Sequence, residues 1–248
     1  MADRNLDWVI VAGANGSIGR AIFERFVARQ VPVLALDRDV DRLTANTGDA
    51  RVIIRSVDLT VEAEVKEVLD SAIPRTERIG LLVNAVGLIW NEPILKLRGA
   101  SLHAHGAESW RKVIEANLTA PFILASLVAA RMARKGGGAI INFSSIASRG
   151  NVGQAAYSAA KSGIEGLTRA MAAELGQVGV RVNAIAPGFL DVPSTHQAMS
   201  DEQLKGIVEH TPVRRLGRCE ELMDAVDFLA ANAFVNGAVL DVNGGLRL

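Results

Sequence analysis

The sequence of 248 residues is poor in several features that mark particular classes of protein. Its single cysteine, Cys219, excludes an internal disulfide framework and is typical of a reducing compartment, so we expect a cytoplasmic protein. Neither charge sign is in excess, because Lys+Arg and Asp+Glu both total 27, and a nucleic-acid partner is therefore not expected. No uninterrupted apolar run approaches the roughly 20 residues of a membrane span, and the first residues resemble no signal peptide. These absences favour a soluble protein that binds neither nucleic acid nor a membrane.

Short β-branched runs alternate with helical patterns along the whole chain, 49% of which is hydrophobic. Continuous apolar runs of this kind predict strands that are buried on both faces. No Pro-, Gly- or Ser-rich linker and no internal repeat divides the chain, so we expect a single domain, 1–248. The predicted fold is α/β: a Rossmann-type, doubly wound parallel sheet of about seven strands with helices on both faces. The strands are expected within 8–13, 31–37, 51–59, 79–87, 138–145, 180–188 and 237–245, and the helices at 17–29, 60–73, 108–134, 154–175 and 219–231.

A glycine-rich turn, G-A-N-G-S-I-G, follows the first predicted strand and contains Gly13, Gly16 and Gly19. Glycines at such a junction let the backbone approach a phosphate, and the next helix offers free N–H groups. The second strand ends about 20 residues later at Asp37, where a carboxylate can bond the hydroxyls of an adenosine ribose. A plain tight turn and a helix-capping aspartate would also explain these features. Together they favour a dinucleotide site.

The only tyrosine in the chain lies in Y-S-A-A-K, which ends at Lys161. Residues i and i+4 share one face of a helix, so Tyr157 and Lys161 can both reach one site. A phenol titrates near pH 10, and a neighbouring ammonium would lower its pKa toward the range useful for proton transfer. A half-buried tyrosine beside a surface lysine is the alternative. Two hydroxyls at the end of the strand 138–145, Ser144 and Ser145, favour the catalytic interpretation.

These motifs, taken in order, resemble the short-chain dehydrogenase/reductase family over nearly the whole chain, from about Trp8 to Gly245. The resemblance is greatest to the 3-oxoacyl carrier-protein reductase branch and to the secondary-alcohol dehydrogenases close to it. The motifs are G-A-N-G-S-I-G, Asp37, V-D-L at 57–59, N-A-V-G at 84–87, E-A-N-L at 115–118, S-S at 144–145, Y-S-A-A-K, N-A-I-A-P-G at 183–188 and N-G-A-V-L-D-V-N-G-G at 236–245.

The resemblance implies a role for each of four catalytic residues. Tyr157 would be the general acid/base, and Lys161 would lower its pKa and bond the nicotinamide ribose. Ser145 would hydrogen-bond the substrate oxygen. Asn117 would hold a water that links the lysine to solvent, at a local bulge in its helix.

The resemblance also implies the residues that bind the cofactor. Asp58 would bond the adenine, and Asn84 and Gly87 would support the middle of the dinucleotide. The segment from Pro187 to Leu190 would border the nicotinamide. The full expected set is Gly13, Asn15, Gly16, Ser17, Ile18, Gly19, Asp37, Arg38, Asp58, Leu59, Asn84, Ala85, Gly87, Tyr157, Lys161, Pro187, Gly188 and Leu190.

Three departures from the family pattern bear on the site. Ser17 stands where the middle glycine of the turn normally falls, although Gly16 should preserve diphosphate binding. Val192 replaces a threonine that often contacts the carboxamide, which would loosen the nicotinamide. The interval from Ser145 to Tyr157 is one residue shorter than is commonest, so Ser144 remains the alternative hydroxyl.

Two segments outside the motifs remain open. The stretch 91–109 is longer than this branch usually has, and its His103 and His105 are expected to be surface loop residues and not metal ligands, because no carboxylate or cysteine completes a site. The segment 189–212 is expected to be the loop that faces the substrate.

The expected function is hydride transfer between NAD(H) and a fairly apolar secondary alcohol or ketone. NAD is favoured over NADP because Asp37 would repel a 2′-phosphate. One alternative is an NADPH-dependent 3-oxoacyl-thioester reductase, and another is a nucleotide-sensing protein without catalysis. The resemblance also implies a homotetramer that pairs through the helices 108–134 and 154–175 and through the C-terminal strand region. Apolar residues on more than one face of both helices support this expectation.

Overall fold

A computed structural model describes residues 7–44 and 51–248 and confirms the predicted α/β class. Seven parallel strands form one sheet in the order β3-β2-β1-β4-β7-β8-β9. The chain adds strands on one side of β1 and then, from β4 on, on the other side, as in a doubly wound fold. The strands are β1 (Trp8–Ala12), β2 (Val33–Asp37), β3 (Val52–Ser56), β4 (Ile79–Asn84), β7 (Gly138–Phe143), β8 (Val180–Pro187) and β9 (Val239–Val242).

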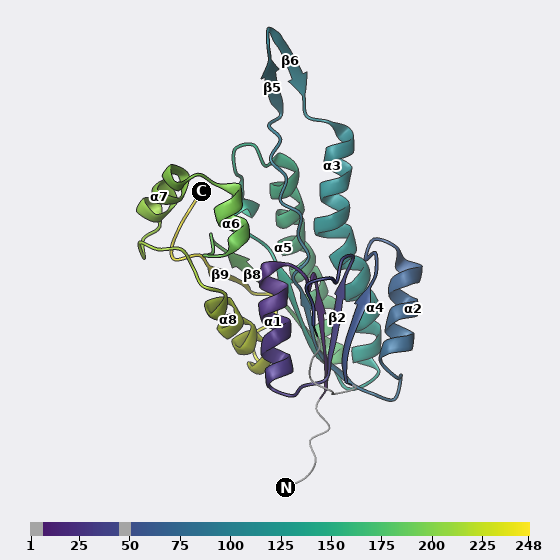
Figure 1. The fold of residues 1–248 in the computed structure, drawn as a ribbon. Coiled ribbons are helices and arrows are strands. Elements are labelled where there is room, and N and C mark those ends of the chain that lie inside the picture. The colour runs from purple at the N-terminus through teal and green to yellow at the C-terminus, as the bar shows by residue number, and fades with distance from the viewer. Residues whose placement is uncertain (1–6, 45–50) are drawn as a thin grey trace.

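Helices cover both faces of the sheet, and each face has its own apolar core (Figure 1). Alternate residues of β1 point to opposite faces, so Ile10 packs into one core and Val11 into the other. The first core lies under α2, α4 and α5, and the second under α1 and α8. These helices are α1 (Ser17–Ala28), α2 (Glu62–Ala72), α4 (Ala120–Ala133), α5 (Ala155–Leu175) and α8 (Cys219–Ala231).

The predicted helix 108–134 consists of three segments: α3 (Ala107–Ile114), the π-helical turn η1 (Glu115–Thr119) and α4. The π turn contains Asn117, so the expected bulge is present. By length and composition, the stretch Ala107–Ala133 is apolar enough to cross a membrane, and 44% of its most apolar window is buried. Here it packs on the sheet, with Leu124 and Val128 fully buried in the first core.

The segment 91–109 contains a feature that the sequence interpretation missed, a β-hairpin that stands out from the body (Figure 1). We call it the arm: β5 (Leu95–Arg98) pairs antiparallel with β6 (Ser101–Ala104) around Gly99, whose φ is +61°. Its base is fixed by two hydrogen bonds, from Glu92 N to Gly153 O at 2.7 Å and from Gln154 Nε2 to Asn91 Oδ1 at 2.7 Å. The arm therefore begins beside the segment that leads into the tyrosine helix.

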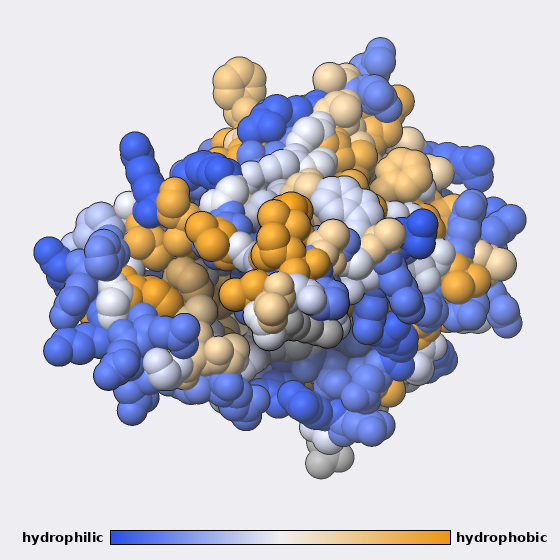
Figure 2. Space-filling model, turned by 90° about the horizontal axis from the view of Figure 1, so that it is seen from above, coloured by the Kyte–Doolittle hydropathy of each residue, from blue (hydrophilic) through white to orange (hydrophobic). Residues whose placement is uncertain are grey.

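The segment 189–212 is largely helical rather than a simple loop. It contains α6 (Pro193–Ala198) and α7 (Asp201–His210), and Ser200 starts α7 with a capping box completed by Gln203. Two short 3₁₀ turns complete the structure, η2 (Ile146–Arg149) after β7 and η3 (Gly176–Val178) after α5. The arm, α6 and α7 all lie toward the carboxyl edge of the sheet, the face that Figure 2 views from above.

Candidate active site

The glycine-rich turn after β1 lies close to Ala85, the first residue after β4. Gly13 has φ +72°, and a Cβ there would lie 2.7 Å from the Ala85 carbonyl oxygen. A Cβ on Gly19 would lie 2.1 Å from the Gly13 carbonyl oxygen, so both positions require glycine. Gly16 precedes α1, whose first turn has no acidic side chain, and its N-terminal N–H groups suit an anion.

Asp37, at the end of β2, lies at the next position along this edge. Its Oδ2 accepts a hydrogen bond from Asn15 N at 2.9 Å, and its Oδ1 accepts one from Arg38 N at 2.7 Å. The carboxylate is thus held by backbone groups and joins the glycine turn to β2. Carboxylate oxygens have further lone pairs, which leaves acceptors for a pair of ribose hydroxyls.

Asp58 lies beyond β3 and is held by Thr60. The Thr60 hydroxyl and backbone N–H donate to Asp58 Oδ1 at 2.7 and 2.9 Å, and these hydrogen bonds lower the pKa of Asp58. The residue is therefore an ionised acceptor at neutral pH.

A cleft of about 320 Å³ joins these groups. One buried polar atom in it, Asn15 Oδ1, has no hydrogen-bond partner among the described residues, as expected of a group that binds a ligand. Close-approach glycines, an anion-binding helix start and acidic acceptors together fit the adenosine and diphosphate of a dinucleotide. The lining residues are Gly13, Asn15, Gly16, Asp37, Arg38, Arg42, Val57, Asp58, Leu59, Thr60, Ala85, Val86, Gly87, Leu88, Ala116 and Ala120.

Lys161 is buried where β4 and β7 end. Its Nζ donates to the Phe143 carbonyl oxygen at 2.9 Å and to the Val86 carbonyl oxygen at 3.3 Å. Burial lowers the pKa of Lys161 to about 8. The two carbonyls fix the ammonium 5.7 Å from the centre of the Tyr157 ring.

Tyr157 is buried on the same face of α5, as its spacing from Lys161 predicts. Burial raises the pKa of Tyr157, and a hydrogen bond with the Ser145 hydroxyl acts in the opposite direction. The predicted lowering of the Tyr157 pKa by Lys161 is therefore wrong for the protein without cofactor. The reason is that burial costs the phenolate more hydration than the Ser145 hydroxyl returns. The phenol is therefore neutral and can donate a proton.

The two serines after β7 have different environments. Ser145 caps the turn η2, its Oγ accepting from Ala147 N at 3.1 Å, and its hydroxyl also reaches Tyr157. The buried Ser144 hydroxyl faces two acceptors on α5, Glu165 Oε1 at 3.0 Å and the Lys161 carbonyl oxygen at 3.2 Å. Its single proton is thereby engaged away from Tyr157, which favours Ser145 as the hydroxyl that meets a substrate.

Asn117 is fully buried in the π turn, and its amide bonds only backbone groups. Nδ2 donates to the Leu88 and Val113 carbonyl oxygens, both at 2.9 Å, and Oδ1 accepts from Leu88 N at 3.0 Å. The side chain therefore joins the helix to the chain after β4. A water held by Asn117 would have to use its backbone carbonyl, which a π turn can free.

Several expected cofactor residues lie outside the cleft. Asn84 is buried beneath it and donates to Asn142 Oδ1 at 3.0 Å, so it supports the end of β4. Ile18 and Gly19 belong to α1, and Ser17 Oγ lies 3.4 Å from Ser194 Oγ of α6. Pro187 ends β8, and Gly188 N donates to the Val242 carbonyl oxygen at 3.0 Å.

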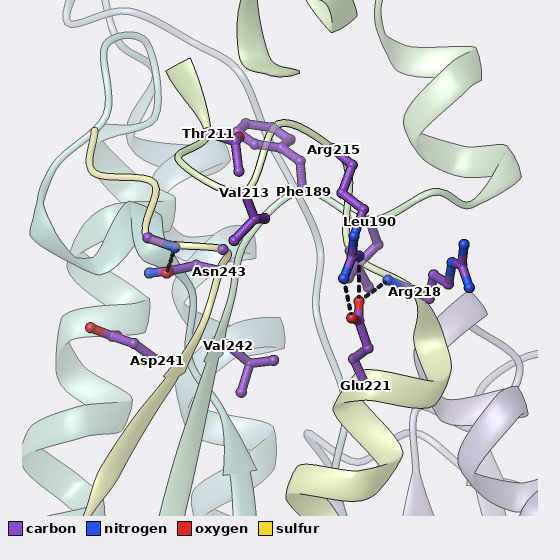
Figure 3. Close-up of a pocket in the computed structure, with 13 residues that line it drawn as sticks. Phe189, Leu190, Thr211, Val213, Arg215, Arg218, Glu221, Asp241, Val242 and Asn243 are labelled. Carbon is purple, nitrogen blue, oxygen red and sulfur yellow. Dashed lines mark hydrogen bonds and ion pairs between the residues drawn. The ribbon is translucent and has the colours of Figure 1, made fainter. Parts of the chain in front are cut away.

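Leu190 lines a second cavity, of about 250 Å³, between the chain after β8 and the end of β9 (Figure 3). On one side of it, Arg215 binds both carboxylate oxygens of Glu221, at 2.5 and 2.9 Å, and Arg218 N donates to the same carboxylate at 2.8 Å. These bonds hold the start of α8 against the chain that follows α7. The cavity lies apart from the dinucleotide cleft.

The two histidines of the arm region differ. His103 is exposed as expected, but it lies in the strand β6 and not in a loop. His105 lies in a loop, but the prediction of a surface position is wrong for it, because its side chain is only 9% exposed. Its Nε2 lies 3.9 Å from Glu92 Oε2 at the base of the arm. Within 7–44 and 51–248, no group of three metal-ligating side chains is present.

The chain is similar in sequence to known reductases. A family model described as Enoyl-(Acyl carrier protein) reductase matches residues 12–247. The chain is 34% identical to 3-oxoacyl-[acyl-carrier-protein] reductase FabG of Escherichia coli K12 over 244 residues, which is 96% of each chain. It is also 34% identical to the short-chain reductase protein NovJ of Streptomyces niveus over 251 residues, 95% of this chain and 92% of the relative.

A solved structure of similar shape is that of a 7α-hydroxysteroid dehydrogenase in complex with NADH and 7-oxo glycochenodeoxycholic acid. The TM-score is 0.85 at 29% identity, over 97% of this chain and 94% of that one. The reductase named above and this dehydrogenase have different substrates, so the fold alone does not name one.

Proposed function

The chain belongs to the short-chain dehydrogenase/reductase family, and on that premise we propose that it reduces a ketone to a secondary alcohol with NADH. The observation that supports this most is the grouping of Tyr157, Ser145 and Lys161 at the carboxyl edge, beside a cleft suited to a dinucleotide. The nicotinamide would supply a hydride equivalent when bound. Side chains of the protein would bind the carbonyl oxygen and supply the proton.

The protein's part is to bind the carbonyl oxygen and to protonate it. The Ser145 hydroxyl is close enough to Tyr157 to influence its pKa, so both hydroxyls can donate to one substrate oxygen. Tyr157 is neutral and gives its proton to the oxygen as negative charge develops there. Lys161 uses two donors on backbone carbonyls, and its third would bond a ribose hydroxyl.

The preference for NADH rests on Asp37. Both of its oxygens are held at the cleft by backbone N–H groups, so the carboxylate cannot easily turn away from an adenosine ribose. A 2′-phosphate there would meet like charge at short range. Arg38 and Arg42 also line the cleft and oppose this effect in part.

An apolar ketone is the preferred substrate class because the nearby cations are engaged. Arg149 binds Asp241 at 2.6 Å, and His196 lies 2.7 Å from Asp191, so neither offers a free clamp for a charged group. The apolar residues expected to border the substrate are Ile146, Val152, Phe189, Leu190 and Val192, with Ile94 and Leu95 of the segment 91–109 on one flank. The ketone in the solved relative has an apolar steroid ring system, although its conjugated end is an acid.

The second candidate is reduction of a 3-oxoacyl thioester, which the relative from Escherichia coli favours. A 3-oxo group needs the same proton donor, so the two candidates differ in the rest of the substrate. The non-catalytic, nucleotide-sensing alternative is disfavoured because the complete set of four catalytic residue types is present.

A steady-state assay with purified protein separates these possibilities. The panel pairs NADH and NADPH with cyclohexanone, a steroid ketone and acetoacetyl-coenzyme A, and uses Tyr157→Phe as the blank. We expect the highest kcat/KM with NADH and an apolar ketone. A thioester preferred by orders of magnitude would establish the second candidate. If the protein binds NADH but converts no substrate of the panel, the non-catalytic, nucleotide-sensing alternative is favoured.

A further inference from the structure

Glu165 lies on α5, one turn beyond Lys161 and two turns beyond Tyr157, outside the set expected from the sequence. Its side chain is only 16% exposed. Its Oε1 accepts from the Ser144 hydroxyl at 3.0 Å and from the Ser148 hydroxyl at 2.6 Å. One carboxylate oxygen thus binds the hydroxyl before Ser145 and a hydroxyl within the turn η2 that follows it.

The turn η2 is also held against α5 by packing, because its buried Ala147 lies in one apolar cluster with Ala156 and Tyr157. The polar links are few among the described residues. The Ser162 hydroxyl donates to the Ser148 carbonyl oxygen, which is a second link at the same end. At the other end, the Ser144 hydroxyl reaches Glu165 and the Lys161 carbonyl oxygen. Because Ser145 caps this turn through Ala147 N, its position follows that of the turn.

The two partners on the substrate oxygen come from different elements, Ser145 from the end of β7 and Tyr157 from α5. Their separation depends on how the turn sits on the helix, and Glu165 is the charged group that joins the two. Hydrogen bonds to a carboxylate are shorter and stronger than those between neutral groups. A displacement of about 1 Å in such a site costs up to roughly a hundredfold in rate.

We propose that Glu165 is a positioning residue that sets Ser145 against Tyr157 by binding Ser144 and Ser148 together. The proposal rests on the proposed function for its kinetic part. A simple surface ion pair does not account for Glu165, since its Arg169 partner is 57% exposed and 3.3 Å away, on the other oxygen. Arg149 also faces Glu165 but is bound to Asp241.

Three variants separate the hydrogen bonds from the charge. Glu165→Gln keeps an Oε1 acceptor for both serines and loses the charge, whereas Glu165→Ala loses the acceptor. Arg169→Ala is the matched control, because it removes only the exposed ion pair. Ser148→Ala is a milder change that removes one donor and serves if Glu165→Ala folds poorly.

The first measurement needs no substrate. Tyr157 is the only tyrosine among the 248 residues, so protein labelled with 3-fluorotyrosine gives one fluorine resonance. We expect Glu165→Ala to move this resonance toward its position in Ser145→Ala, and Ser148→Ala to move it part of the way. Glu165→Gln and Arg169→Ala should leave it at the wild-type position.

The second measurement is kinetic and uses the ketone or thioester that the wild type reduces best. Glu165→Ala should lower kcat by roughly ten- to a hundredfold. Its dissociation constant for NADH, followed by cofactor fluorescence, should stay at the wild-type value. Glu165→Gln should restore most of kcat.

An unmoved fluorine resonance in both Glu165→Ala and Ser148→Ala overturns the proposal, as does a Glu165→Gln variant that is as impaired as Glu165→Ala. If the wild type reduces no member of the panel, the proposed function fails, yet the fluorine experiment still decides the role of Glu165.

Discussion

Burial shifts the pKa values of the two ionisable groups of the site in opposite directions. It raises the pKa of Tyr157 and lowers that of Lys161 to about 8, because it disfavours the charged form of each. At neutral pH the phenol holds its proton firmly and the ammonium is still largely charged. The pair is thus prepared to donate a proton, and the negative charge left on the phenol would arise beside a cation.

Tyr157→Phe tests the proton donor with a minimal change. The ring and its packing remain, so the protein should fold and bind NADH as before. Turnover should fall by a factor of at least about 100, the low end of what a general acid contributes. Cofactor fluorescence and steady-state kinetics measure the two effects. Activity within tenfold of the wild type would place the donor elsewhere.

Lys161 should make the stability of the protein depend on pH in a definite direction. Its pKa is about 8 in the folded protein and 10.5 in the reference state, so between these values the unfolded chain holds a proton that the folded chain has released. Raising the pH through this window therefore favours the folded state.

Urea denaturation at pH 8 and at pH 10 measures this dependence. The free energy of unfolding of the wild type should rise relative to that of Lys161→Met, which has no group to titrate there. Both proteins should also have Tyr157→Phe, because the phenol lies beside Lys161 and its titration would not be the same in the two proteins. Cys219 is present in both and cancels in the comparison. Parallel pH profiles for the two proteins would contradict the buried ammonium.

Asp37→Ala tests the choice of cofactor. The change removes the repulsion against a 2′-phosphate while leaving Arg38 and Arg42 in place. The ratio of kcat/KM for NADH to that for NADPH should fall by roughly tenfold or more. A like-charge contact near a surface costs about 1 to 4 kcal/mol, and about 1.4 kcal/mol already corresponds to tenfold. Asp39→Ala, an exposed neighbour outside the cleft, is the matched control and should leave the ratio unchanged.

At the scale of elements, the seven strands and five main helices followed from the sequence because their apolar periods are clear. The strand residues Val9, Val33 and Val83 are all buried, and the glycine turn and the Tyr157–Lys161 pair fall where those elements predict. These features depend on local pattern alone. They could therefore be read from the chain without any knowledge of its contacts.

The missed elements had weaker signals. The arm shows apolar-polar alternation around Gly99, L-K-L-R-G-A-S-L-H-A, a hairpin pattern within a segment expected to be a loop. The helix α7 begins with Ser200 and Gln203, a capping signature that the loop interpretation overlooked.

Contacts between distant residues left no local trace. Glu165 is 21 residues from Ser144, and nothing in the helical pattern around it marks it as a partner. The direction of the shift in the Tyr157 pKa could not be predicted from the sequence either, because it depends on how much of the side chain the fold buries.

The arm should contribute little to the stability of the protomer. Leu95, Leu97 and Leu102 share one of its faces and remain 60–68% exposed. Removal of the arm would therefore expose almost no apolar surface that is buried in the protomer. Replacing residues 95–104 by a short Gly-Ser linker should change Tm by less than about 2 °C, measured by circular dichroism. Leu124→Ala, in the core, should lower it clearly. A comparable loss from removal of the arm would mean that its apolar face is covered in solution.

At the scale of the whole molecule, apolar surface remains beyond what the two cores use. Phe122 of α4 is 49% exposed, and less than half of the apolar window within Ala107–Ala133 is buried in the protomer. The outward residues of α5 include Ala159, Gly166 and Ala170, which are small enough for a second helix to approach closely. With no net charge to oppose association, these faces favour the expected homotetramer.

Gly166→Arg tests this assembly without harming the protomer. A Cβ at Gly166 meets no heavy atom within 4 Å, and replacing a glycine within a helix gains about 1 kcal/mol in helix propensity. The variant should therefore fold at least as well, while the long side chain prevents close packing of α5 on its copy. Light scattering at micromolar concentration should give a tetramer mass for the wild type and a smaller species for Gly166→Arg. Gly206→Arg, at an equally open glycine in α7, should remain tetrameric. A monomer mass for the wild type would refute the assembly, and a tetrameric Gly166→Arg would show that α5 lies outside the interface.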